Sequence, residues 1–141
     1  MKINSFINLT IILPVTDEVQ SLKKTIEIIC NDSPNEDLHF LFVCHKKKTI
    51  TQSISICNKY LLKDSSKYKL IFQNLPNLGG AIRNGFDEIK TSHCVMMSSD
   101  LETDPHIVKT MIDNIKKKPN SVITANRWSS INNFYGYGKI K

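Results

Sequence analysis

Short apolar runs alternate with amphipathic segments along this 141-residue chain, and this alternation limits the fold more than any other feature. A short, continuous apolar run is typical of a buried strand, whereas apolar residues spaced three or four apart are typical of a helix. Strands that alternate with helices form βαβ units. Such units produce a mainly parallel sheet with helices on both faces. We therefore predict an α/β fold with three layers, α/β/α.

Five segments have the composition of strands, and four amphipathic segments separate them. The strand-like segments are residues 9–13, 39–44, 68–72, 94–97 and 121–125. The helical stripes are Val19, Leu22, Ile26 and Ile29; Ile50, Ile54, Cys57 and Leu61, with Thr49 as a candidate cap; Ala81, Ile82, Phe86 and Ile89, after Gly79 and Gly80; and Ile107, Met111, Ile112 and Ile115. From Ser129 onward the sequence is rich in Asn, Gly and Tyr and is typical of a loop. We find no linker between domains.

The charge and composition narrow the class of partner. The formal net charge of +6 is compatible with nucleotide phosphates, lipid phosphates or an anionic membrane face. The lysines are scattered, including the runs at 46–48 and 116–118, which we interpret as solvated. Because no basic patch is interleaved with aromatic residues, we do not expect nucleic-acid binding.

The cysteines and the N-terminal segment favour the cytoplasm. Cys30, Cys44, Cys57 and Cys94 form neither a C-x-x-C pair nor zinc-ligand spacing, so we interpret them as reduced thiols. Polar residues interrupt the N-terminal segment, which therefore does not resemble a signal peptide. No stretch approaches the ~20 apolar residues of a membrane-spanning helix. Any membrane association would be peripheral.

Acidic residues directly follow the fourth strand-like segment. Asp100 and Glu102 come after a buried run, and Asp104 is suited to cap a helix that begins at Pro105. Ligands of parallel sheets bind at the carboxyl ends of the strands. A carboxylate about 4 Å from a phosphate oxygen costs about 4 kcal/mol at an effective dielectric near 20, so a divalent cation would be needed between them. The alternative is that these acids are a helix cap and solvated loop residues.

Other strand ends also carry candidate ligand contacts. Residues 14–18 could cradle a base or ribose, although Asp17 and Glu18 could instead only cap the following helix. Residues 77–85 combine an Asn that tolerates a left-handed backbone with glycines that permit close approach of a ligand, or form a simple tight turn. Arg127 follows the fifth strand-like segment and could pair with a phosphate, or lie on the surface. His45 ends the second segment and could approach a ligand.

Taken in order, these segments resemble family 2 glycosyltransferases of the GT-A fold, near the polyprenol-phosphate sugar transferases of the dolichol-phosphate mannose synthase type. That family has Pro-x-x-Asn-Glu after the first strand and a Gly-Leu-Gly-x-Ala turn after the third. Asp-x-Asp-Leu follows its fourth strand, and Ser-Arg follows the next. The counterparts here are Pro14–Glu18, Asn77–Ala81, Ser98–Leu101 and Asn126–Arg127. The likeness covers roughly residues 9–128.

The resemblance implies a Rossmann-like GT-A fold that binds a nucleotide sugar, with residues 1–128 as the donor-binding domain and 129–141 as the start of an otherwise missing acceptor region. It implies transfer of a sugar from a UDP- or GDP-linked donor to a polyprenyl-phosphate or glycan acceptor, with inversion. Asp100 would be catalytic, and Asp100 and Glu102 would hold Mg²⁺ or Mn²⁺. The residues implied to contact the nucleotide sugar are Pro14, Val15, Asp17, Glu18, His45, Gly79, Gly80, Ser98, Ser99, Asp100 and Arg127. The cellular role implied is cell-envelope glycan synthesis in the cytoplasm, at the inner face of the membrane.

Three departures from the family pattern leave a second function open. Ser98 stands where the family has the first Asp of its acidic pair, and Cys44-His45 replaces the acid that helps hold the base. The acceptor-binding half is expected to be missing. A degenerate or truncated nucleotide-sugar-binding module without transferase activity is therefore the alternative. A receiver-like signalling domain fits less well, because Gln73-Asn74 stands where that class needs a phosphorylatable Asp.

Overall fold

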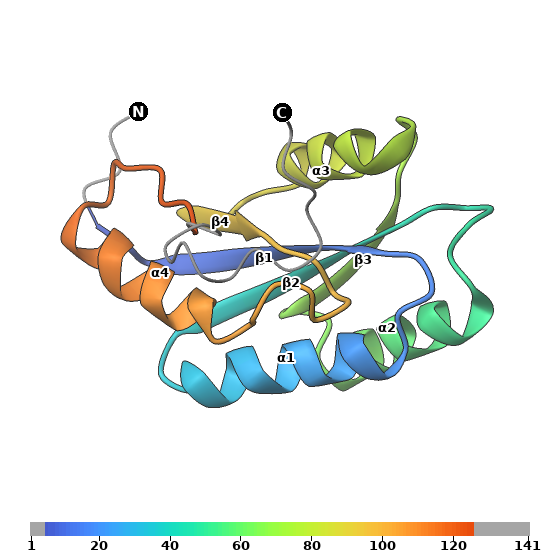
Figure 1. Cartoon of the computed structure of the whole chain (residues 1–141), viewed down its shortest axis with the longest axis horizontal. Helices are drawn as coiled ribbons and strands as arrows, with labels where there is room; N and C mark the ends of the chain where they lie inside the picture. The colour runs from blue at the N-terminus through green and yellow to red at the C-terminus, as the bar shows by residue number, and fades with distance from the viewer. Residues whose placement is uncertain (1–4, 126–141) are drawn as a thin grey trace, which may run out of the picture.

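The computed structural model describes residues 5–125, which form a four-stranded parallel sheet in the order β3-β2-β1-β4 with four helices. The elements in chain order are β1 (Asn8–Val15), α1 (Gln20–Asp32), β2 (Asp37–Cys44), α2 (Thr51–Lys63), β3 (Tyr68–Phe72), α3 (Asn77–Asp87), β4 (His93–Met96) and α4 (Ile107–Lys117). The helices lie on both sides of the sheet, with α3 alone on one side and α1, α2 and α4 on the other (Figure 1). The predicted three-layer α/β/α fold is confirmed.

Successive side chains of a strand point to opposite faces of the sheet, so the apolar core is divided into two parts. Ile11 and Leu13 of β1 belong to the larger core, which includes Phe40 and Phe42 of β2 and side chains of α1, α2 and α4. Ile12, between them in sequence, faces the other way and packs in the smaller core with Leu41, Val43 and Ala81. Successive side chains of a strand point to opposite faces, so β1 and β2 are apolar on both.

The pairing of β1 explains why β4 separates from it before β1 itself ends. β1 pairs with β2 along its whole length, from Asn8↔Asp37 to Val15↔Cys44. Its ladder with β4 ends at Ile12↔Met96, and the Met97 N–H donates to the Ile12 carbonyl at 3.1 Å. Pro14 has no N–H with which to continue a ladder. The chain after β4 therefore leaves the strand direction beside Pro14.

The predicted fifth strand is wrong. Residues 121–125 have no strand assignment, and Val122 is 92% exposed. The chain instead turns after α4, where the Ser121 N–H donates to the Lys118 carbonyl at 3.1 Å. His93 Nε2 donates to the Pro119 carbonyl at 2.8 Å and fastens this turn to the start of β4. An apolar segment forms a strand only where other apolar side chains can cover it.

Two helix starts also differ from the prediction. α3 begins at Asn77, so both glycines that were expected to precede it lie inside its first turn. α4 begins at Ile107 rather than Pro105. The N-cap position is His106 rather than Asp104, and the Asp104 carboxylate accepts the His106 N–H at 3.1 Å in the turn before the helix. Within residues 5–125, no helix is both long enough and apolar enough to cross a membrane.

Candidate functional site

A cavity of about 230 Å³ opens at the carboxyl ends of β1, β2 and β3, beside the start of α3. Its lining comes from the strand ends, from the loops that follow them and from the first turn of the helix: Pro14, Val15, Thr16, Val43, His45, Lys48, Gln73, Asn77, Leu78 and Ala81. The carboxyl edge of a parallel sheet is where open α/β folds bind ligands, so this cavity is the candidate binding site.

Thr49 ties together the loops that form one wall of the cavity. Its hydroxyl donates to the Val15 carbonyl at 2.7 Å and accepts the His45 N–H at 2.7 Å. The Ile50 N–H donates to the Thr16 carbonyl at 2.8 Å. We predicted Thr49 as a helix cap, but α2 begins at Thr51 and the Thr49 side chain joins the ends of β1 and β2 instead.

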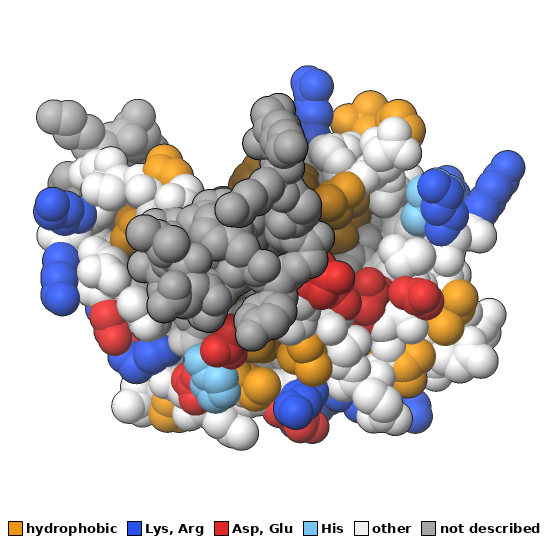
Figure 2. Space-filling model, in the orientation of Figure 1, with side chains coloured by type: hydrophobic (Ala, Val, Ile, Leu, Met, Phe, Trp, Pro, Cys, Tyr) orange, Lys and Arg blue, Asp and Glu red, His pale blue; other side chains and the backbone are white. Residues whose placement is uncertain are grey.

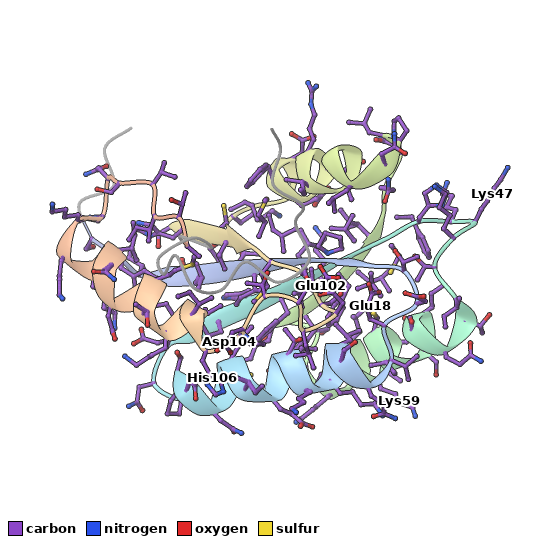
Figure 3. All side chains as sticks on the ribbon, viewed as in Figure 1. Glu18, Lys47, Lys59, Glu102, Asp104 and His106 are labelled. Atoms are coloured by element: carbon purple, nitrogen blue, oxygen red, sulfur yellow. The ribbon has the colours of Figure 1, made fainter. Side chains whose placement is uncertain are left out.

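The hydrogen bonds of the His45 ring show which of its two nitrogens carries the proton when the ring is neutral. Nδ1 lies 3.0 Å from the Lys47 nitrogen and 3.2 Å from the Lys48 nitrogen, and both are backbone N–H donors. Nδ1 must therefore accept, which places the proton of the neutral ring on Nε2. Lys48 lines the cavity, and all three lysines of the run 46–48 are exposed, as we predicted. Figure 3 shows the neighbouring Lys47 side chain extending away from the body of the molecule.

The Gln73 side chain is held in one orientation at the end of β3. Its Nε2 donates to the Leu75 carbonyl at 2.6 Å and to the Asn77 carbonyl at 3.1 Å. Its backbone N–H donates to the Cys44 carbonyl at 2.8 Å, next to β2. Because both partners of the amide are carbonyls, the amino group must face them and Oε1 is left as an acceptor.

The two glycines at the start of α3 have different surroundings. A Cβ on Gly80 would lie 2.6 Å from the Leu75 carbonyl carbon and oxygen, whereas a Cβ on Gly79 would have no atom within 4 Å. Asn77, the first residue of α3, has a φ of 61°, in the left-handed region as its residue type allowed. Gly80 thus permits close approach of its own chain. Neither Gly79 nor Gly80 lines the cavity.

The loop of residues 98–102 (the acidic loop) follows β4 and is anchored beside the cavity. The Ser99 hydroxyl donates to the Pro14 carbonyl at 2.8 Å, and Ser99 is only 1% exposed. Asp100 Oδ1 accepts from the Ser98 hydroxyl and from the Glu102 N–H, the latter at 2.9 Å. Leu101 has a φ of 69° in this tight turn. Figure 3 shows Glu18 and Glu102 on the loops that follow β1 and β4.

Asp100 is ionised at neutral pH. Partial burial alone would raise the pKa of this carboxyl, but hydrogen bonds from the Ser98 hydroxyl and from backbone N–H groups outweigh it and hold the pKa below its usual value. Asp100 and Glu102 are both exposed. Figure 2 shows acidic side chains gathered in a band on this side of the molecule.

The acidic loop offers part of a metal site. Within residues 5–125, no group of three or more His, Cys, Asp or Glu residues is placed to hold a metal ion. Asp100 Oδ2 and the Glu102 carboxylate have no hydrogen-bond partner among the described residues, so two carboxylates face solvent. Mg²⁺ is typically bound through one or two carboxylates together with substrate phosphates and water. The donor set therefore fits a divalent cation that is shared with a phosphorylated ligand.

The predicted site residues are distributed over the cavity and its rim. Pro14, Val15 and His45 line the cavity, and Ser98, Ser99, Asp100 and Glu102 form the acidic loop beside it. Asp17 and Glu18 lie in the loop after β1, where the Glu18 carboxylate accepts the Thr16 N–H at 2.6 Å. Neither lines the cavity. Arg127 lies outside the described residues.

Sequence reasoning missed three lining residues, Val43, Lys48 and Gln73. Three others, Thr16, Leu78 and Ala81, lie inside the segments 14–18 and 77–85, which were predicted as candidate ligand contacts. One signal could have found Gln73, since it directly follows the third strand-like segment, as His45 follows the second. Lys48 gave no such signal, because only the turn around His45 brings it to the cavity.

A sequence model of the family described as Glycosyl transferase family 2 matches residues 10–141 of the chain. The match includes every residue of the cavity and of the acidic loop. No curated protein matches the chain.

Proposed function

Because the chain belongs to glycosyl transferase family 2, we propose that it binds a nucleotide-activated sugar and transfers the sugar to an acceptor. The hydrogen bond from Ser99 to the Pro14 carbonyl supports this most directly, because it fixes the acidic loop against the cavity. A nucleoside in the cavity would then direct its diphosphate toward Asp100 and Glu102. One bound ligand would use both parts of the site.

The cavity residues bind and orient the nucleoside. Pro14 and Val15 supply an apolar wall, and His45, Lys48 and Gln73 supply polar groups at the other strand ends. The walls are held by hydrogen bonds between loops, so little ordering is needed when the ligand binds.

Asp100 is the proposed catalytic residue, and Asp100 and Glu102 are the residues that would hold Mg²⁺ or Mn²⁺. When bound, such a cation would supply positive charge opposite the departing nucleoside diphosphate. Asp100 is suited to this because its carboxylate stays ionised. The turn around Leu101 sets the Glu102 backbone against Asp100 and so fixes where the two carboxylates leave the chain.

The acceptor we propose is a lipid phosphate, of the polyprenyl type, or a glycan. It would attack the anomeric carbon from the face opposite the leaving group, which inverts the configuration. A phosphate anion needs no general base. The proposed cellular role is cell-envelope glycan synthesis by a cytoplasmic protein at the inner membrane face, and the net charge of +6 supports peripheral contact with anionic lipid. Arg127 remains a proposed phosphate contact.

A nucleotide-sugar-binding module without transferase activity is the second candidate. The small donor set of the acidic loop favours it, since Ser98 stands in the place of an acid and its hydroxyl bonds to Asp100. Both candidates need the cavity and differ only in turnover.

Calorimetry tests both proposals together, and turnover separates them. We expect at least one of UDP, GDP and CDP to bind more tightly with Mn²⁺ than without it. Release of nucleoside diphosphate from a sugar donor, with formation of a glycosylated acceptor, would favour the enzyme over the module. If the folded chain binds none of the three nucleotides, both proposals are wrong.

A further inference from the structure

We propose that the chain has a second ligand site, a pocket for a phosphate group at the amino ends of the strands. This pocket (the amino-end pocket) has a volume of about 340 Å³ and is lined from the starts of β1, β2 and β3, from residues 65–67 and from the loop 88–91. It shares no lining residue with the cavity at the carboxyl ends. The inference therefore goes beyond the proposed function and does not depend on it.

The amino-end pocket lies where the α3 side of the sheet changes from apolar to polar. Ile12 of β1 and Leu41 of β2 pack on that side in the smaller core. Two residues earlier in each strand, Thr10 and His39 share this face and are direct neighbours in the ladder. Lys69 of β3 pairs with Leu41 and lies on the same face. The polar side chains of three strands thus form one wall of the pocket.

The charged lining of the amino-end pocket has more cations than anions. It contains three lysines and one glutamate. Lys69 Nζ donates to Glu88 Oε2 at 2.5 Å, and this ion pair holds the pKa of the Glu88 carboxyl below its usual value. The ion pairs among residues 5–125 include neither Lys67 nor Lys90. Two ammonium groups are therefore left for a ligand.

The neutral polar side chains of the lining add a further donor and no strong acceptor. Asn8 Oδ1 accepts the Ser92 N–H at 2.8 Å, so only the amino group of this amide is left for a ligand. Both ring nitrogens of His39 face acceptors, the Ser66 carbonyl at 3.1 Å and an Asp37 carboxylate oxygen at 3.2 Å. The ring thus presents no free lone pair to the pocket.

A phosphate group complements this lining. It carries about two negative charges at neutral pH, and its oxygens accept hydrogen bonds. Lysine binds phosphate as a point charge, so a surplus of ammonium groups attracts it whatever their order around the pocket. A cationic ligand would meet the same charges as repulsion. The amino-end pocket is therefore a site for an anion and not for a cation.

Two contacts hold the walls of the amino-end pocket together. The Thr10 and Thr91 hydroxyls lie 2.7 Å apart, and the Thr91 hydroxyl donates to the His93 carbonyl at 2.8 Å, so Thr10 is the donor to Thr91. The ion pair between Lys69 and Glu88 joins the sheet to the end of α3 in the same way. The pocket is thus formed before a ligand binds, which lowers the entropy cost of binding.

The amino-end pocket is separate from the candidate nucleotide site. Thr10 lines the first and Pro14 the second, and between them on the same face of β1 Ile12 is completely buried. A phosphate bound here is therefore not the diphosphate of the proposed donor. Its source is either a soluble phosphomonoester or the headgroup of a lipid, which present the same chemistry to the lysines.

Calorimetry with inorganic phosphate tests the amino-end pocket on the full chain. No divalent cation is added, so the proposed metal site does not contribute. We expect phosphate to bind, and Lys67→Ala and Lys90→Ala each to weaken it about tenfold, the effect of losing one charge-assisted hydrogen bond. If phosphate does not bind, or if neither variant weakens it, the proposal is wrong.

A double variant with a matched control separates the pocket from the net charge. Lys67→Ala with Lys90→Ala removes two charges from the pocket, and Lys24→Ala with Lys59→Ala removes two from α1 and α2. These helices lie on the other side of the sheet from α3 (Figure 1), and all four lysines are exposed. We expect the control to bind phosphate as the unmodified chain does. Equal weakening in the two double variants overturns the proposal, and thermal unfolding checks both folds.

Two further titrations identify the source of the phosphate. One uses glycerol 3-phosphate, and the other uses phosphatidylcholine vesicles that contain phosphatidic acid. We expect the pocket double variant to weaken at least one of them and the control to weaken neither, and the titration that depends on the pocket lysines names the source. If neither titration depends on them, the proposal fails. The pocket double variant should also keep the nucleotide affinity of the unmodified chain with Mn²⁺, and its loss would show that the two sites are not separate.

Discussion

The Ser99 hydroxyl donates to the Pro14 carbonyl at 2.8 Å, across 85 positions of sequence. Pro14 ends the ladder between β1 and β4 because it has no N–H, and its carbonyl is then satisfied by a side chain rather than by a strand. The bond holds the acidic loop against the wall of the cavity. The relative positions of the proposed base site and the proposed metal site therefore depend on these two residues.

We expect Ser99→Ala to lower the free energy of unfolding by about 1–2 kcal/mol, because the partly buried Pro14 carbonyl loses its hydrogen bond. The variant should also reduce the gain in nucleotide affinity that Mn²⁺ provides, since the acidic loop loses its anchor. Chemical denaturation and calorimetry measure the two effects. Ser55→Ala, on the exposed side of α2, is the control and should change neither. Unchanged manganese dependence in Ser99→Ala would show that the bond does not position the loop.

We expect Asp100→Asn to abolish metal-dependent nucleotide binding and to leave the fold intact. The carboxylate is exposed, so the amide fits without a packing change, but it offers the cation no negative charge. Calorimetry with and without Mn²⁺ measures the loss. Asp87→Asn, at the exposed end of α3, is the matched control. Manganese-dependent affinity equal to that of the unmodified chain would refute the metal assignment.

The layers of the fold could be predicted because they depend on periodicity. Phe40 and Phe42 on one face of β2, and Leu41 and Val43 on the other, mark a strand buried on both sides. The segment 121–125 has a similar composition and forms no strand. Sequence composition shows that a segment is apolar, whereas a strand also needs a free partner edge and a covering layer, and neither is local in sequence.

The candidate site could be predicted only where a residue stands at a strand end. Pro14, Val15 and His45 were found in this way and line the cavity. The direction of a hydrogen bond is not visible in the same pattern. That the His45 ring accepts at Nδ1, and that Gly80 makes room for Leu75 rather than for a ligand, depends on local contacts that only the folded chain forms.

Tyr68 is expected to make the protein less stable as the pH rises above 10. Its ring stacks with that of Phe40 at a centroid distance of 5.4 Å and contacts Tyr60 at 5.0 Å. Burial raises the pKa of its phenol from 10.0 to about 12. The unfolded chain thus loses this proton first. The corresponding stability is complete below pH 10 and is lost as the pH rises through about 12.

Tyr68→Phe tests this dependence, because it keeps the ring and removes the titrating group. We expect the free energy of unfolding of the unmodified chain to fall more steeply above pH 10 than that of the variant. Urea denaturation at a series of pH values measures both slopes. Below pH 10 the two profiles should run parallel, which serves as the internal control. Parallel profiles above pH 10 as well would show that the buried phenol does not titrate as described.

The adjacent glycines at the start of α3 give opposite predictions for the same substitution. Gly79→Ala places a methyl group in open space, and it should be neutral or stabilise the protein by up to about 1 kcal/mol, because alanine favours a helix over glycine. Gly80→Ala places the methyl group 2.6 Å from the Leu75 backbone, which has no flexible end to move aside. We expect it to cost about 1–3 kcal/mol through overpacking. Denaturation of the two variants side by side measures the difference, and each serves as the control for the other.

Because Leu75 leads into the turn that Gln73 holds, Gly80→Ala should also weaken nucleotide binding, and Gly79→Ala should not. Equal stability of the two variants would mean that the turn shifts freely, and the fixed orientation of the Gln73 amide would then be wrong.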